Sequence, residues 1–514
     1  MKETPLPLFA RPFRPLLILL SVIVFTMGTL PTVAVQAQDK AQEAARNLFK
    51  DSLQPSRDGR SHNMISALRH LKDPTLAPYF HILADSATPM HQIHGHLGLA
   101  EISESQSLDM AALAEVTDPL AQGEIITAAM DSDLVTDDQL KVMLEWPGLD
   151  IGVKMLILTK RLSLATQGHM APLEEAIKSD KPARSGLAGL LLHQLGDPRG
   201  KSALDMLDEL QDSQRDPIRG QLLEIVLARE MESAADWALR IAQEPDVHPK
   251  LKPLALQTAL RFNHPAAVEV WKQTFQSTSS LAYQYRYAID ALRVAPYQSS
   301  QSQFEFLATS ENPMLKQIGV AGISISTKGG DIADQVVALV DFQHSKINSW
   351  AIKYANTLAS PEDAQLILFS IIYSYQESDP RHRLTRLDES VTAAQYLFEL
   401  SPEMALRFMR PILSDTAVDP ELKQAILLGL VRSQTPGGSM FIQDGDTFGT
   451  PESDYLALLL LAKDNKQLTE LELKDMALVV RGGSGLQTSL RIQAAWQYLK
   501  YIGADTGRFI QALK

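Results

Sequence analysis

The chain has 514 residues, of which 45% are hydrophobic and 21% charged, with a formal net charge of −13 and no cysteine. Single hydrophobic cores stop growing at about 250–300 residues, so this length excludes one compact domain and indicates several domains or a solenoid. The missing cysteine excludes disulfides, thiolate metal sites, a cysteine nucleophile and a lipid-attachment cysteine, and the acidic balance argues against a nucleic-acid partner.

The first 37 residues have the parts of a bacterial signal peptide. Lys2, Arg11 and Arg14 form a positive n-region, and residues 16–27, LLILLSVIVFTM, form an apolar h-region. Residues 35–37, VQA, place small side chains where a signal peptidase cleaves, so we expect cleavage after residue 37. The leader holds three basic residues and one acidic residue, so its removal changes the formal net charge from −13 to −15.

A signal peptide predicts an exported protein. An exported chain without disulfides fits the periplasm or cell envelope of a bacterium. The alternative is an uncleaved N-terminal membrane anchor, although the apolar run is shorter than the about 20 residues that a spanning helix needs. We expect no stable membrane span once the leader is cleaved.

Residues 38–60 predict an N-terminal helical cap, with the helix itself over residues 38–53. A solenoid needs a polar-faced cap at each end to remain soluble. Residues 489–501 and 508–513 are expected to close the stack at the other end.

Stretches related to TPMHQIHGHLGLA, residues 88–100, recur along the chain. A residue that can cap a helix precedes a proline, and apolar positions then recur on one side of the helix. Related phrases begin at Asp118, Asp216, His248, Asn312 and Asp419.

The second position of each phrase gives a register for the whole chain. Neighbouring marks lie 28–40 residues apart, which is the period of solenoid repeats. The marks are Pro89, Pro119, Pro147, Pro182, Pro217, Pro249, Ser280, Pro313, Ser345, Pro380, Pro420, Pro451 and Gly485.

Each unit also holds a second helix with its own start signal. The signals are Asp73-Pro74, Asp197-Pro198, His264-Pro265, Ser360-Pro361 and Ser401-Pro402. Apolar residues then recur at three- and four-residue steps, which predicts amphipathic helices. We expect these second helices to line the concave surface of the solenoid.

The link Leu195-Gly196-Asp197-Pro198 between two such helices resembles that of HEAT-type α-solenoids. The resemblance covers roughly residues 60–514 and lies in the pattern of the repeats, not in close identity to one protein. The signature of tetratricopeptide repeats is missing. The resemblance implies an all-α fold, a right-handed α-α superhelix of about thirteen helix pairs. The solenoid would occupy residues 61–432, followed by a polar loop insertion at 433–454 and by C-terminal repeats and a cap at 455–514. A further irregular link is expected at 324–331, SISTKGGD.

Half of the histidines lie between His62 and His96. His91 and His94 are three residues apart on one predicted helix, so both could face one way. The zinc motif H-E-x-x-H is absent, and we expect packed or surface histidines without a metal. A metal- or ligand-dependent activity at His62–His96 is the alternative. It requires His91, His94 and a carboxylate to converge within bonding distance.

Two glycine-containing loops carry weaker signals. Asp444 and Asp446 in QDGDTF, residues 443–448, lack the remaining ligands of a calcium loop, so a turn is expected. The stretch RGGSG, residues 481–485, lacks the lysine of a phosphate-binding loop and predicts the end of a helix.

No catalytic, cofactor-binding or metal-binding residue is predicted. The sequence therefore favours a non-catalytic scaffold that binds a protein or peptide partner along a solenoid surface. The alternative within this class is an accessory subunit of an envelope enzyme or export complex. It would show a large apolar patch on the helices or in residues 433–454. Partner identity and oligomeric state are not specified by the sequence.

Overall fold

Helices begin where a capping side chain precedes proline. Asp118 accepts a hydrogen bond at 3.1 Å from the backbone N–H two residues on, at the start of α7 (Pro119–Asp131). Asp197 does the same at 2.9 Å for α13 (Pro198–Asp208). Each carboxylate satisfies an N–H group that has no intrahelical partner, and proline fits the first position because it has no N–H.

The computed structural model describes residues 30–56, 59–376, 383–433, 435–442, 448, 450–464, 468–482 and 488–513, and the regular structure in these ranges is helical. The first half contains α2 (Leu30–Ser52), α3 (Arg60–Arg69), η1 (Pro74–Leu76), α4 (Ala77–Ala84), α5 (Pro89–Ile102), α6 (Met110–Ala114), α7, α8 (Asp137–Glu145), α9 (Ile151–Lys160), α10 (Ser163–Thr166), α11 (Ala171–Ala176), α12 (Pro182–Gln194), α13, α14 (Asp212–Ala228), η2 (Glu232–Ala234), α15 (Ala235–Gln243) and α16 (Leu251–Arg261). The second half contains α17 (Ala267–Ser277), α18 (Leu281–Val294), α19 (Ser300–Ala308), α20 (Pro313–Thr327), α21 (Ile332–Val340), α22 (Ser345–Ala355), α23 (Pro361–Tyr373), α24 (Arg383–Leu400), α25 (Pro402–Ser414), α26 (Pro420–Arg432), η4 (Gly438–Phe441), α27 (Pro451–Lys463), α28 (Glu470–Val480), α29 (Thr488–Tyr501) and α30 (Thr506–Gln511).

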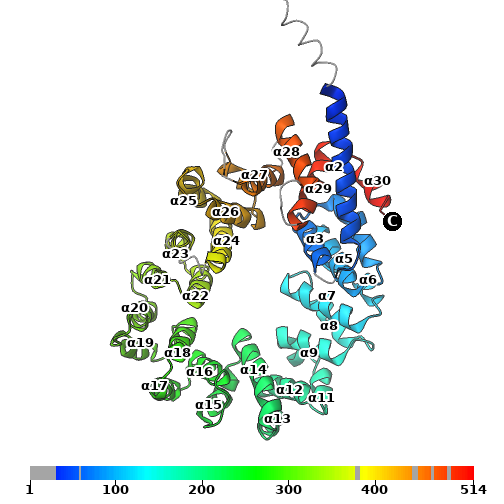
Figure 1. Ribbon diagram of the computed structural model, residues 1–514. Helices are drawn as coiled ribbons and strands as arrows, with labels where there is room; N and C mark the ends of the chain where they lie inside the picture. The colour runs from blue at the N-terminus through cyan, green and yellow to red at the C-terminus, as the bar shows by residue number, and fades with distance from the viewer. Residues whose placement is uncertain are drawn as a thin grey trace, which may run out of the picture.

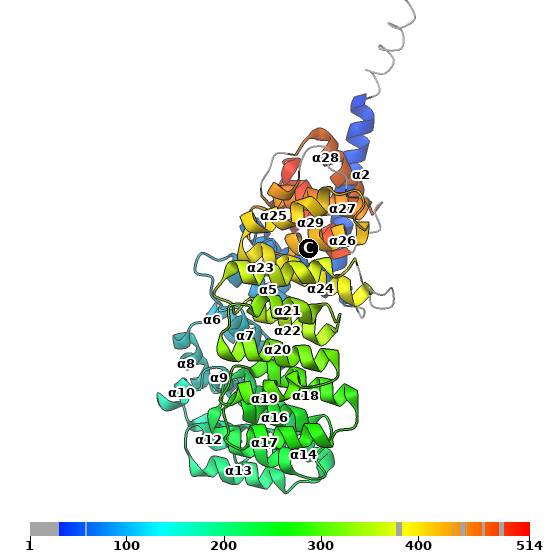
Figure 2. The ribbon, with the colours of Figure 1, turned by 90° about the vertical axis from the view of Figure 1, so that its left-hand side faces the viewer.

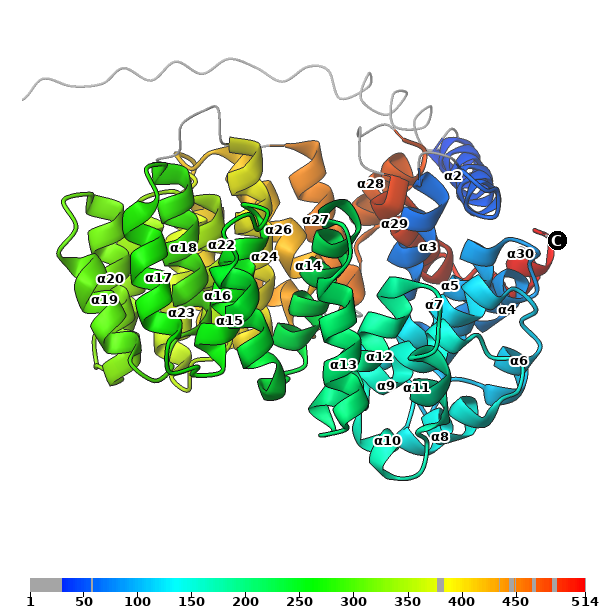
Figure 3. The same cartoon turned by 90° about the horizontal axis from the view of Figure 1, so that it is seen from below.

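These helices form a HEAT-like solenoid that closes into a ring (Figure 1). Antiparallel neighbours stack along the chain, as Figure 2 shows for α16–α24. After α27 the chain continues through α28 and α29, and α29 packs directly on α3 (Figure 3). The sequence predicts a solenoid but not its closure.

The two helices of a unit occupy different layers. In Figure 1, α14, α16 and α18 lie toward the centre of the ring, whereas α13, α15 and α17 lie on its outer side. The prediction that the second helices line the concave surface is therefore wrong. The inner helix α12 buries six residues, four of them aliphatic, whereas α13 buries only three. An inner helix contacts both neighbouring units and the outer layer, so it needs apolar residues on several faces. An outer helix needs only one apolar stripe.

Glycines set the distance between paired helices. A Cβ atom on Gly98 of α5 would lie 2.5 Å from the ring of Phe80 in α4, and one on Gly322 of α20 would lie 2.2 Å from the ring of Phe304 in α19. Both glycines are nine positions after the proline of their phrase. Both phenylalanines are fully buried, so the repeat uses one packing solution twice.

Four aromatic side chains, from four helices, hold the junction of the ring. Phe49 of α2 lies 5.4 Å from Tyr79 of α4, 5.7 Å from Trp496 of α29 and 5.4 Å from Phe509 of α30, measured between ring centroids. We call these four residues the junction cluster. Aromatic contacts at such distances add to the free energy of burial, so the two ends of the chain share one core.

Polar contacts fix the register of this junction. Asp73 Oδ2 accepts hydrogen bonds from Trp496 Nε1 at 2.8 Å and from Lys500 Nζ at 2.7 Å. Gln493 Nε2 donates to the carbonyl oxygen of Ala67 at 2.7 Å. Burial raises the pKa of Asp73, but the hydrogen bonds from Lys500, Thr75 and Trp496 outweigh it and hold this pKa below its usual value. The segments that the sequence predicts as the two end caps therefore contact each other.

The helix α2 runs through the predicted cleavage site at residue 37 and extends away from the ring in Figure 1. Its C-terminal part buries Ala41, Ala45, Leu48 and Phe49. The h-region, residues 16–27, lies outside the described residues. Within the described residues, no helix is both long enough and apolar enough for a membrane crossing.

Two predicted boundaries differ from the structure. Pro217 lies inside α14, which begins at Asp212, and the expected cap at Asp216 does not form there. The helix α20 continues to Thr327, so the irregular link is shorter than residues 324–331. In both cases the packing of the whole helix overrides a local proline or glycine signal.

The predicted polar loop, residues 433–454, is partly ordered by buried contacts. It contains η4 and the start of α27, and Phe441 and Phe448 are buried. Asp464 accepts backbone hydrogen bonds from Gly437 at 2.9 Å and Ser439 at 2.6 Å. Asp444 and Asp446 lie outside the described residues.

Candidate interaction surface

The structure pairs His94 with His62 rather than with His91. His94 Nε2 and His62 Nδ1 are 2.8 Å apart, and Arg69 Nη1 lies 3.1 Å from His94 Nδ1. Arg69 itself forms a two-point ion pair with Glu101, whose shorter contact is 2.5 Å. Because guanidinium is always a donor, His94 accepts at Nδ1 and donates from Nε2.

This arrangement keeps His94 neutral. Burial, followed by the charge of Arg69, lowers the pKa of His94 from 6.5 to about 3. Both ring nitrogens of His94 already have partners, so neither presents a free lone pair to a metal ion.

His91 points elsewhere on the same helix. Its Nδ1 lies 3.3 Å from the Ser86 hydroxyl, and its Nε2 is buried without a hydrogen-bond partner. Among the described residues, no group of three or more His, Cys, Asp or Glu side chains could hold a metal ion. The hypothesis of a metal site at His62–His96 required His91, His94 and a carboxylate to converge, and it is wrong on this geometry.

His96 lines a polar pocket of about 590 Å³ between α4, α5 and α6. Asp85, Asp109 and Ser103 also line it. Burial lowers the pKa of His96, while the charges of Asp109 and Asp85 act in the opposite direction. The net result is an imidazole that is harder to protonate.

A buried polar tie joins two inner helices on the opposite side of the ring. Glu389 Oε2 of α24 accepts hydrogen bonds from Asn348 Nδ2 of α22 at 2.7 Å and from Arg386 Nη1 at 2.5 Å. All three side chains are buried, and burial raises the pKa of Glu389. This cluster stabilises the inner wall, because a buried charge is tolerated only when it is paired.

An apolar groove of about 670 Å³ lies between α7 and α9. Both helices border the centre of the ring in Figure 1. Leu120 on α7 is 68% exposed and Leu156 on α9 is 40% exposed, although leucine is ordinarily a core residue. We call this feature the α7–α9 groove; its floor includes Val153 and Gly123.

A second groove, of about 400 Å³, lies between α14 and α16, the corresponding helices three units along the chain. Its lining is mixed in charge, with Asp216 and Glu224 facing Lys250 and Arg286. Arg286 is fixed there by a 3.1 Å hydrogen bond to the carbonyl oxygen of Lys250. Grooves between successive ring helices are thus a recurring feature, and the α7–α9 groove is the more apolar in its residues.

The sequence reasoning did not single out Leu120 and Leu156. The buried residues of α7 include Ala121, Ile125 and Ala129, which follow the helical period. Leu120 lies off this face, next to the proline. An aliphatic residue outside the apolar register was the signal that could have marked the groove.

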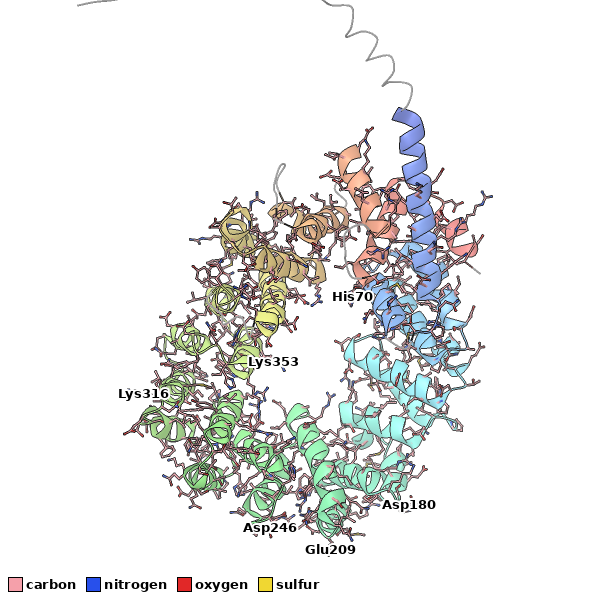
Figure 4. The ribbon with its side chains drawn as sticks, in the orientation of Figure 1. His70, Asp180, Glu209, Asp246, Lys316 and Lys353 are labelled. Atoms are coloured by element: carbon pink, nitrogen blue, oxygen red, sulfur yellow. The ribbon has the colours of Figure 1, made fainter. Side chains whose placement is uncertain are left out.

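His70 and Lys353 lie at the inner rim of the ring in Figure 4, and Asp180, Glu209, Asp246 and Lys316 lie at its outer rim. The labelled residues at the inner rim are thus a histidine and a lysine, whereas those at the outer rim carry charges of both signs.

Comparison with known proteins identifies no family. No family model and no curated protein matches the chain. Among solved structures, the chain is similar to karyopherin Kap121p bound to the SUMO protease Ulp1p, with 12% identity, a TM-score of 0.35, and coverage of 92% of this chain and 58% of the other. The structure of Kap121p bound to Ste12p gives 12% identity, a TM-score of 0.34, and coverage of 90% and 57%. This chain thus spans less than two thirds of the length of those chains. Because the TM-scores are low, the fold assignment rests on the helices of this chain and not on the similarity.

Proposed function

We propose that the protein is an exported, non-catalytic scaffold that binds a protein or peptide partner. The observation that carries the proposal is the α7–α9 groove, where Leu120 and Leu156 are exposed to solvent in a groove of about 670 Å³. Apolar side chains gathered in a groove are typical of binding surfaces, whereas isolated exposed leucines need no explanation.

A closed ring suits a binding scaffold better than an open solenoid does. A partner that contacts several inner helices meets a surface whose two ends are already joined, so little conformational entropy is lost on binding. The predicted leader, residues 1–37, supports an extracytoplasmic location, in the periplasm or cell envelope.

The test is site-specific photocrosslinking in cells that export the full chain. A photoreactive phenylalanine replaces Leu120 in the groove, and in the control it replaces Met206, which is 69% exposed on the outer helix α13. The proposal expects a discrete protein adduct from position 120 and none from position 206. Equal adducts from both positions, or none from either, would overturn it. Mass spectrometry of the same protein tests whether the chain begins at residue 38.

A further inference from the structure

The α7–α9 groove has the length of a peptide. Its α7 wall follows one stripe, Pro119, Gly123, Thr127 and Asp131, along the whole helix. At 1.5 Å per residue the thirteen residues of α7 span about 20 Å. Such a length accommodates three to four turns of a helix, whereas a single small molecule would occupy only part of it.

Gly123 brings the two walls together. A Cβ atom at this position would lie 2.8 Å from Val153 Cγ2 of α9. The close approach makes Val153, which is 7% exposed, the floor, and it leaves the more exposed Leu120 and Leu156 on the walls. Aliphatic side chains of a ligand would therefore meet aliphatic side chains on three sides.

The rim of the groove is acidic. Its ionisable lining residues are Glu124, Asp131 and Asp150. Asp131 forms an ion pair with Lys160, and Asp150 lies 4.0 Å from Arg184. Glu124, in the middle, forms no ion pair with any residue in the described part of the chain. Glu124 thus offers an unpaired negative charge next to the apolar floor, whereas Lys160 and Arg184 balance the charges of Asp131 and Asp150.

We propose that the α7–α9 groove binds an amphipathic segment of a partner protein that presents aliphatic side chains together with Lys or Arg. This inference rests on the proposed scaffold function and names the chemistry of its partner. Electrostatic complementarity selects against acidic segments and against nucleic acid, and it increases the association rate with basic ones. The recognition mode is a helix laid in a groove, with anchors at three- and four-residue steps.

The test uses a defined probe, a fifteen-residue helical peptide with Leu at i, i+3, i+4 and i+7 and Lys elsewhere. Two matched peptides replace every Lys by Glu or every Leu by Ser. Binding to the purified chain that begins at residue 38 is measured by fluorescence anisotropy. We expect the Leu/Lys peptide to bind at least about tenfold more tightly than either relative, since loss of one buried anchor or of charge matching costs this much.

Variants then locate the binding. Leu120→Asp combined with Leu156→Asp should weaken binding of the Leu/Lys peptide at least about tenfold, and Glu124→Lys at least about threefold, as for a rim charge. The matched controls are Met206→Asp and Asp246→Lys, both on exposed outer positions, and they should leave the affinity within about twofold. Circular dichroism establishes that each variant is folded.

Two results would overturn the inference. One is tight binding of the Leu-to-Ser peptide, which means unspecific attraction to an acidic protein. The other is equal weakening by the groove variants and the controls. Failure of the inference and failure of the scaffold function are separable. If a protein adduct still forms at position 120 in cells, the scaffold function stands and only the proposed partner chemistry is wrong.

Discussion

The Gly322 and Phe304 pair shows how single residues fix the spacing of this solenoid. The glycine is required for close approach of α20 to α19, because its neighbour is a fully buried ring with no room to move. The same pair recurs as Gly98 and Phe80.

We predict that Gly322→Ala lowers the free energy of unfolding by about 1–3 kcal/mol, as expected for overpacking a core. Urea denaturation followed by circular dichroism measures the change. The control is Gly330→Ala, where an added Cβ meets nothing within 4 Å, and its effect should stay within about 0.5 kcal/mol. Equal stabilities of the two variants would show that the helices can separate without cost.

His94 links the stability of the ring to pH. Its pKa is about 3 in the folded chain, whereas an ordinary histidine has a pKa of 6.5, so between these values the unfolded chain binds the proton and the folded chain does not. The stabilisation is complete above pH 6.5 and is lost as the pH falls toward 3. From pH 6.5 to pH 5 the loss attributable to His94 is about 2 kcal/mol.

We predict that His94→Gln flattens the dependence of the unfolding free energy on pH between pH 6.5 and pH 5. Urea denaturation at several pH values gives the two slopes. Identical slopes for the wild type and for this variant would contradict the neutral, buried state of the imidazole.

At the scale of elements, the junction between α3 and α29 decides whether the solenoid is open or closed. Trp496 is fully buried there and donates to Asp73. We predict that Trp496→Ala costs about 3–5 kcal/mol, as for other buried aromatic truncations, and separates α28 and α29 from α2. The chain has no cysteine, so single cysteines at Lys50 and Lys474 can carry spin labels, and the distance between them should lengthen and broaden.

Trp271→Ala provides the matched control for this experiment. Trp271 is equally buried, but in α17, far along the chain from the junction. It should lower stability by a similar amount and leave the spin-label distance unchanged. A distance that changes in both variants would mean that the ring loosens as a whole.

The elements themselves could largely be predicted from the sequence. Asp118-Pro119, Asp197-Pro198 and Asp419-Pro420 are local signals, and helices begin at each of them. Local signals cannot say which layer a helix joins, because that depends on contacts far along the chain. The junction contacts connect residues more than 400 positions apart, and no periodicity carries such information.

The α7–α9 groove could not be predicted from the sequence for a related reason. Leu120 and Leu156 are ordinary residues in a leucine-rich chain, and only the packing of α7 on α9 shows that they face solvent. The alternative of a joint site at His91 and His94 failed because spacing alone does not fix the contacts of a side chain. His91 and His94 share a helix face by spacing, yet each bonds to a different neighbour.

At the scale of the whole molecule, the ring predicts that its ends depend on each other. Deletion of residues 488–514 removes Trp496 and Phe509 from the junction cluster and leaves Phe49 and Tyr79 exposed. We predict a larger radius of gyration by small-angle X-ray scattering and a lower thermal midpoint. A chain beginning at residue 38 keeps all four aromatic residues and serves as the control. An unchanged radius after the deletion would argue against closure.

Closure of the ring also changes the surroundings of the first and last helices. In an open array the first and last repeats have one neighbour each, and they fray before the interior does. Here the C-terminal part of α2 packs on α29, so the first and last parts of the described chain have neighbours across the junction. The order of the helices around the ring is therefore cyclic, and a circular permutant, cut at the link between α20 and α21 and joined across the old ends, would contain the same set of neighbours.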